Sequence, residues 1–262
     1  MIPTLAALVE FKAFTLVLFR MSGLFLSAPL LGNRDIPLQV KIGLAALTAF
    51  LIFPSVPHAA EALPRNLGGY VGFAAAELAV GVTVGLAASM LLSAFQLAGQ
   101  HVGTQMGLSM ADIVDPFSDT EVSVVGQFHF FLALAVYVAA GAHRWLLGAV
   151  ADSFRSVPLG GFRPTEALVQ MLVDAFGTIL MLSFQITAPV LVALFLSTVA
   201  LGFVARAVPQ MNVLLLSFPI QIGLGLGIFL WTLPGLGALS LNLFETLASD
   251  VQRLLGAMVP DA

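Results

Sequence analysis

The sequence predicts an all-α protein of the integral-membrane type, built from apolar helices that form hairpins and are broken in places. Hydrophobic residues make up 59% of the 262 residues, charged residues only 9%, and the mean hydropathy is +1.02. Ordinary soluble domains carry about 25% charged residues, so water cannot be the main surroundings of this surface. The apolar runs also lack the strict alternation of a membrane barrel, whereas helices satisfy their own backbone groups in lipid. We therefore expect helices throughout.

Six apolar blocks approach or exceed the roughly 20 residues with which a helix crosses a bilayer. They cover residues 13–31, 42–57, 70–98, 122–142, 168–205 and 213–240. The second block is short and contains Pro54, and the fifth is interrupted by Pro189, which predicts two half-helices or a hairpin there. Broken helices usually lie inside protein or beside a water-filled cavity.

The chain is expected to form one all-helical domain over residues 1–262, because no low-complexity tract, fixed-period repeat or linker interrupts it. Lys and Arg number 10 against 14 Asp and Glu, a net charge of -4, so nucleic acid is not an expected partner. Cys is absent, which excludes disulfides and thiolate chemistry. The first residues lack the basic segment of a cleaved signal peptide, and we expect none.

Motifs for cofactors are missing. The glycines of GLGLG at 223–227 lack the preceding strand and the spacing of a nucleotide site. Small residues in apolar helices favour close helix packing instead. The same packing role is expected for Gly81, Gly85, Gly99, Gly103 and Gly107.

Metal and catalytic motifs are missing as well. The four His residues show no metal-ligand spacing; they are His58, His101, His129 and His143. Ser109 and Ser153 have no His and carboxylate that the sequence can assign to them as a triad. We therefore expect no metal, no cofactor and no enzymatic activity.

The segment 99–123, GQHVGTQMGLSMADIVDPFSDTEVS, is the most unusual of the chain. It carries four acidic residues and no Lys or Arg between two very apolar blocks: Asp112, Asp115, Asp119 and Glu121. The spacing of a calcium loop is missing. Two interpretations remain, a solvated acidic connection or a semi-polar loop that lines or closes a pathway, with Met106 and Met110 as deformable contacts.

Four charged residues lie within or near the apolar blocks: Arg20, Glu77, Asp174 and Arg206. A charge at bilayer depth costs about 2.5–3.5 kcal/mol on insertion scales, so such side chains face protein or water and find partners. They could form a proton or ion relay, or an ion pair or hydrogen bond that fixes helix register. We predict that Arg20 contacts a carboxylate, a backbone carbonyl or a helix C-terminus.

A turn is predicted within residues 206–219. Pro209 lacks an N–H group and disfavours helix at Val208, and Asn212 can cap the helix that follows. Pro219 is expected to interrupt that helix again. We expect the turn to pack against neighbouring subunits.

Four separated segments together point to a known family. They are RMSGLFLSAPLLGNRDIPLQVKIGLA (20–45), MGLSMADIVDPFSDTEVSVVGQF (106–128), GAHRWLLGAVADSFRSVPLGG (141–161) and RAVPQMNVLLLSFPIQIGLGL (206–226). The most specific part is Pro209, Gln210, Met211 and Asn212 shortly after Arg206, followed by Asp115-Pro116. In order and spacing these segments resemble the FliR family of flagellar export proteins and, more distantly, its injectisome counterparts.

The resemblance implies an export-gate subunit without catalysis, at the bacterial inner membrane and the flagellar basal body, largely on the periplasmic side. Its fold would resemble a fusion of FliP and FliQ in a spiral assembly, with FliP-like, FliQ-like and FlhB-like subunits and membrane lipid as partners. Unfolded flagellar proteins would pass through the centre. The loop 106–123 takes the place of the family's plug, and the seal would fall to Met106, Leu108, Met110, Ile113, Val114 and Phe117.

A second hypothesis is a proton-coupled secondary transporter of a small molecule. Its site would consist of Arg20, Glu77 and Asp174 at broken helices. Such a protein is expected to purify alone, as a monomer or a symmetric oligomer, whereas a gate subunit is expected to come with its partners.

Overall fold

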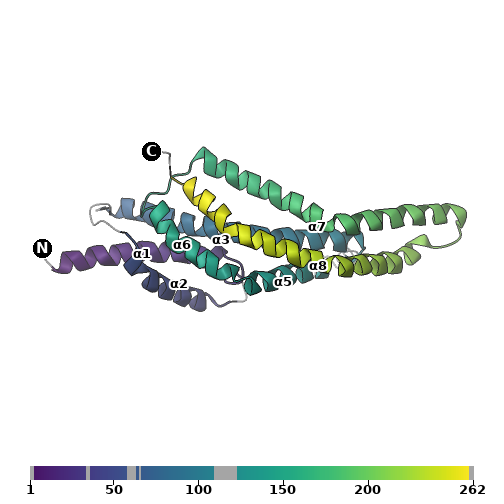
Figure 1. The fold of residues 1–262 in the computed structure, drawn as a ribbon, viewed down its shortest axis with the longest axis horizontal. Helices are drawn as coiled ribbons and strands as arrows, with labels where there is room; N and C mark the ends of the chain where they lie inside the picture. The colour runs from purple at the N-terminus through teal and green to yellow at the C-terminus, as the bar shows by residue number, and fades with distance from the viewer. Residues whose placement is uncertain (1–2, 34–35, 58–62, 65, 109–122, 260–262) are drawn as a thin grey trace. The chain divides into compact units, whose positions relative to one another are not determined.

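The computed structural model describes residues 3–33, 36–57, 63–64, 66–108 and 123–259, and all of its described elements are helices (Figure 1). They are α1 (Pro3–Ser27), α2 (Leu38–Ile52) with the short 3-10 helix η1 (Phe53–Ser55), α3 (Leu67–Gln105), α5 (Val124–Ala139), α6 (Ala142–Ser156), α7 (Glu166–Ala207) and α8 (Val213–Gly256). The all-α prediction is confirmed for the described part of the chain.

Four described helices are long and apolar enough to cross a membrane: Leu38–Ser55, α3, α7 and Leu215–Gly256. The pair α5 and α6, bent by 66°, adds a fifth if it counts as one span. The first predicted block is not among them. Helix α1 ends at Ser27, so every stretch of it long enough for a span also includes Glu10, Lys12 and Arg20.

Two predicted helix breaks are wrong. Helix α7 runs continuously through Pro189, and α8 runs continuously through Pro219. A proline removes one backbone hydrogen bond, while ending a helix in apolar surroundings would leave several backbone groups unsatisfied. Helix α6 was not among the six blocks, because its polar face lowers the hydropathy of that stretch.

The chain divides into two compact units that are described separately. Unit 1 comprises residues 1–90, 138–176 and 243–262, and unit 2 comprises 91–137 and 177–242. In unit 1, α1 crosses α3 at glycines: a Cβ added to Gly81 would collide with the carbonyl oxygen of Arg20, and one added to Gly23 would lie 2.9 Å from the Val82 nitrogen. The predicted close packing at Gly81 is therefore confirmed.

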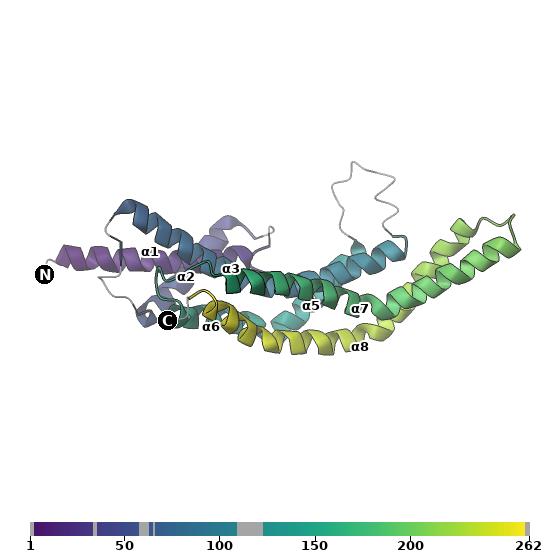
Figure 2. The same ribbon diagram turned by 90° about the horizontal axis from the view of Figure 1, so that it is seen from above.

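In unit 2, the end of α3 packs against the start of α5. A Cβ added to Gly99 would lie 2.6 Å from the Cα of Gly126, so this contact admits only glycine on the α3 side. Helices α7 and α8 run side by side in this unit up to the turn that joins them (Figure 2), and Gln221 Nε2 donates a hydrogen bond to Thr198 Oγ1 at 3.3 Å between them.

Candidate functional site

Arg20 and Glu77 form an ion pair in the interior of unit 1. Arg20 lies on α1 and Glu77 on α3, and the Nε group donates to Glu77 Oε2 at 2.5 Å. Both side chains are 0% exposed. The ion pair lies next to the glycine crossing of α1 and α3. Gly23 and Gly81 are one helical turn further along these two helices, and they let the two backbones approach.

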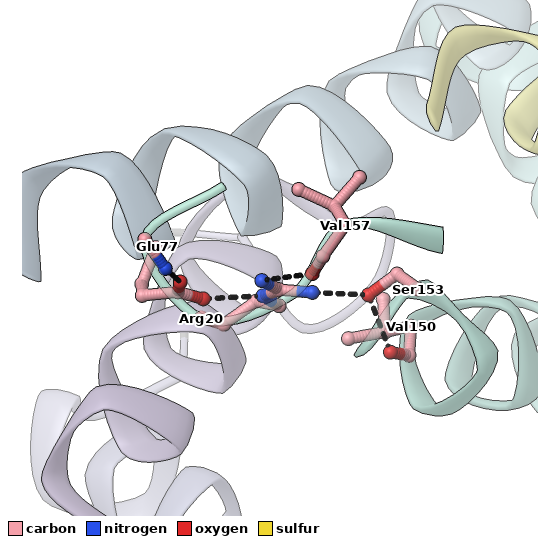
Figure 3. Close-up of polar contacts among 6 residues, drawn as sticks. Arg20, Glu77, Val150, Ser153 and Val157 are labelled. Carbon is pink, nitrogen blue, oxygen red and sulfur yellow. Dashed lines mark hydrogen bonds and ion pairs between the residues drawn. The ribbon is translucent and has the colours of Figure 1, made fainter. Parts of the chain in front are cut away.

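The other two nitrogens of Arg20 bind the end of α6 (Figure 3). Nη1 donates to Ser153 Oγ at 2.9 Å, and Nη2 donates to the carbonyl oxygen of Val157 at 2.9 Å. Val157 is the C-terminal cap of α6, whose last carbonyls have no partner within the helix. The hydroxyl of Ser153 donates in turn to the Val150 carbonyl at 2.6 Å.

The segment after α6 completes the network, which we call the Arg20 node: Arg20, Glu77, Ser153, Val157 and Gly160. The Gly160 N–H donates to Glu77 Oε1 at 2.8 Å, so both carboxylate oxygens have donors. Gly160 has a φ of +74°, which favours glycine, and a Cβ there would collide with the Phe73 ring.

A face of the guanidinium is covered as well. The Cζ atom of Arg20 lies 4.1 Å from the centroid of the Phe154 ring, which is a cation–π distance. The node is therefore enclosed, and each of the three guanidinium nitrogens of Arg20 donates one hydrogen bond. Its chemistry is that of a fixed cross-link between α1, α3 and α6, because a guanidinium stays protonated and each of its nitrogens has an acceptor. The prediction that Arg20 contacts a carboxylate or a backbone carbonyl is confirmed.

Asp174 and Arg206 do not belong to this buried group, and their expected role in contacts of the assembly stays a prediction. Both side chains are exposed on α7. Asp174 accepts a hydrogen bond from Gln170 Nε2 at 2.9 Å, one turn earlier on the same face. The transporter hypothesis requires Asp174 beside Arg20 and Glu77, and these contacts give it no support.

The turn between α7 and α8 lies where the sequence predicts it. Helix α7 ends at Ala207 and α8 begins at Val213. Asn212 Oδ1 accepts a hydrogen bond from the Leu215 N–H at 3.4 Å, which is the expected cap. The side chains of the turn are all exposed: Pro209, Gln210, Met211 and Asn212.

The loop expected to seal a pore is described only at its ends. Met110, Ile113, Val114 and Phe117 lie outside the described residues. Met106 is 0% exposed, and its side chain lies where a Cβ added to Gly225 of α8 would be. Leu108 is 38% exposed, and Gly107 has a φ of +82°.

Sequence reasoning missed the residues that complete the Arg20 node on the side of α6. The sequence presents Ser153 only as a possible nucleophile, and it carries no local signal at Phe154, Val157 or Gly160. Their separation from Arg20 exceeds 130 residues, for example 133 for Ser153 and 137 for Val157. No local pattern links such positions. The one available signal was a buried arginine that required several acceptors.

Comparison with known proteins decides the family. A family model described as bacterial export proteins, family 1, matches residues 11–247. The flagellar biosynthetic protein FliR of Bacillus subtilis (strain 168) is 32% identical over 251 residues, covering 94% of this chain and 95% of that protein. The chain belongs to the FliR family of bacterial export proteins.

Two further relatives show the breadth of the FliR family. Flagellar biosynthetic protein FliR of Escherichia coli (strain K12) is 28% identical over 93% of this chain and 91% of its own length. Yop proteins translocation protein T of Yersinia pestis is 27% identical over 79% of this chain and 80% of its own length. The family match includes the Arg20 node and the turn at 208–212.

Proposed function

We propose that this FliR-family chain is a structural and gating subunit of the flagellar type III protein-export apparatus and helps to form a pore for unfolded flagellar proteins. The flagellar and Yop-translocation relatives support this proposal. It places the chain in the bacterial inner membrane at the flagellar basal body, largely on the periplasmic side. Its partners are FliP-like, FliQ-like and FlhB-like subunits.

The observation that carries the proposal is the length of apolar surface left open on α7 and α8. These helices have 42 and 44 residues. At 1.5 Å per residue each is roughly 65 Å long, about twice the thickness of a hydrocarbon core. Large apolar side chains are exposed near both ends of α7, as at Val169 and Phe203. Lipid covers only part of such a surface, and we assign the rest to neighbouring subunits.

Gating is assigned to the loop 106–123, whose tip lies outside the described residues. A gate must block ions when idle and yield to a chain of any sequence, which requires deformable contacts on a fixed base. Buried Met106 and the left-handed Gly107 supply such a base in unit 2. The exposed Pro209, Gln210, Met211 and Asn212 are assigned to subunit contact.

Co-expression with FliP-like and FliQ-like subunits, followed by detergent extraction and size-exclusion chromatography, tests this proposal. The tagged chain should elute with both subunits in one complex. A strain without its own FliR should regain secretion of flagellar proteins when the chain is supplied. Purification of the chain alone, as a monomer or a symmetric oligomer, would contradict the proposal.

A further inference from the structure

A groove of about 370 Å³ lies in unit 1 between α6 and the last part of α8. Three small residues belong to its lining, Gly148 and Ala149 from α6 and Ala248 from α8. Longer side chains from both helices line the rest: Arg144, Trp145, Asp152, Glu245 and Gln252.

The groove is open at Gly148. A Cβ added to Gly148 would meet no atom within 4 Å, so the packing of the chain itself does not require glycine there. Trp145 beside it is 40% exposed. A small residue in a helix lets the backbone of another helix approach closely, and a half-exposed Trp is a frequent anchor of protein interfaces.

The charges in the groove are unbalanced. Asp152 and Glu245 are exposed on opposite walls, and neither makes a hydrogen bond or ion pair with another described residue. The guanidinium of Arg144 lies beside Gly141, at the start of α6. Two carboxylates facing one groove favour a cation between them.

The helices that line the groove are tied to other parts of unit 1. Ser153 ties α6 to Arg20, and Phe154 packs beneath the same guanidinium. The segment after α6 is tied to the end of α8, because the Arg163 N–H donates to the Met258 carbonyl at 2.9 Å. These contacts fix the C-terminal end of α6 to α1 and the segment after α6 to the end of α8.

We propose that this groove binds a helix of a neighbouring subunit of the export apparatus. That helix places a Lys or Arg between Asp152 and Glu245, and it presents small or apolar side chains to Gly148 and Trp145. The inference rests on the proposed function, since the neighbour is taken to be another subunit. The two carboxylates, the open glycine and the exposed Trp of the lining together specify a basic, small-residue helix.

Photo-cross-linking identifies the occupant. Gly148 is replaced by p-benzoylphenylalanine, the complex with FliP-like and FliQ-like subunits is purified and irradiated, and the cross-linked peptides are identified by mass spectrometry. We expect a peptide of another subunit with a Lys or Arg within one helical turn of the attachment point. Cross-links only to lipid, to a second copy or within the chain would overturn the proposal, as would none.

Two variants change the groove independently. Asp152→Lys with Glu245→Lys reverses its charge, and Gly148→Leu fills it. Either should lower the yield of co-purified subunits about tenfold, equivalent to about 1.4 kcal/mol in binding. The matched controls are Asp250→Lys, in the exposed ion pair that Asp250 forms with Arg253 at 3.6 Å, and Gly148→Ala. Both controls should stay within about twofold of the unsubstituted chain.

The two proposals fail in different ways. If the unsubstituted chain fails to co-purify with any subunit, the proposed function is wrong and the groove proposal falls with it. If the unsubstituted chain co-purifies and both groove variants match their controls, only the groove proposal is wrong. Recovery of the charge-reversed variant by a Lys→Glu or Arg→Glu change in the cross-linked helix would support the groove proposal directly.

Discussion

The guanidinium of Arg20 and the carboxylate of Glu77 meet at 2.5 Å although they lie 57 residues apart, and neither side chain is exposed. The pair holds α1 against α3, and the remaining donors of Arg20 hold the end of α6. A buried, hydrogen-bonded pair of this kind contributes little net free energy by itself, but its disruption leaves a buried charge unpaired.

Replacing Arg20 by Met should destabilise the chain by about 3–5 kcal/mol, because Glu77 would remain buried without its cation. The double variant Arg20→Met with Glu77→Met should recover most of that loss. Arg20→Lys should not, since an ammonium cannot span the acceptors on α3 and α6. The midpoint of thermal unfolding in detergent measures all three. An unchanged midpoint for Arg20→Met alone would refute the cross-link.

The same substitution should have opposite effects at two glycines of α3. Gly81→Ala should destabilise unit 1 by about 1–3 kcal/mol, because the new Cβ collides with the Arg20 carbonyl oxygen. Gly72→Ala is the matched control, since a Cβ there meets nothing within 4 Å. It should stabilise the helix by up to about 1 kcal/mol. If both substitutions shifted the midpoint of thermal unfolding in the same direction, that result would argue against the close crossing of α1 and α3.

Replacing Pro209 and Asn212 by Ala should impair assembly more than expression. Loss of the Asn212 cap removes the acceptor of the Leu215 N–H and costs about 1 kcal/mol at the start of α8. Membrane levels, measured by immunoblot, should stay near those of the unsubstituted chain, while co-purification with FliP-like and FliQ-like subunits falls. Asn242→Ala, at an exposed position of α8, is the control. Unchanged co-purification would show that the turn is not a subunit contact.

The seal of the proposed gate should depend on the apolar residues of the loop and not on its carboxylates. Replacing Met110, Ile113, Val114 and Phe117 by Ser should make an assembled complex leaky to small ions in liposomes or planar bilayers, because polar side chains admit water. Amide replacements of Asp112, Asp115, Asp119 and Glu121 should leave the leak unchanged. Lost assembly, or an unaltered leak in an assembled complex, would rule out the plug assignment.

The sequence by itself determined the class of protein, the positions of most helices, the turn at 208–212 and the family. These properties depend on local or one-dimensional patterns. Long apolar runs predict helices in lipid, and Pro209 with Asn212 predicts where one helix stops and the next begins. The family follows from four segments in a fixed order, and the match over residues 11–247 confirms it.

Only the tertiary structure decided which charges are buried and what they bind. Arg20, Glu77, Asp174 and Arg206 look alike in the sequence, yet only the first two are enclosed within the chain. The difference depends on which face of its helix each charged residue occupies. It also depends on distant partners such as Ser153, which lies 133 residues from Arg20. The apolar surroundings of α7 likewise explain why it continues through Pro189. In such surroundings one missing backbone hydrogen bond costs less than a helix end, which leaves several backbone groups unsatisfied.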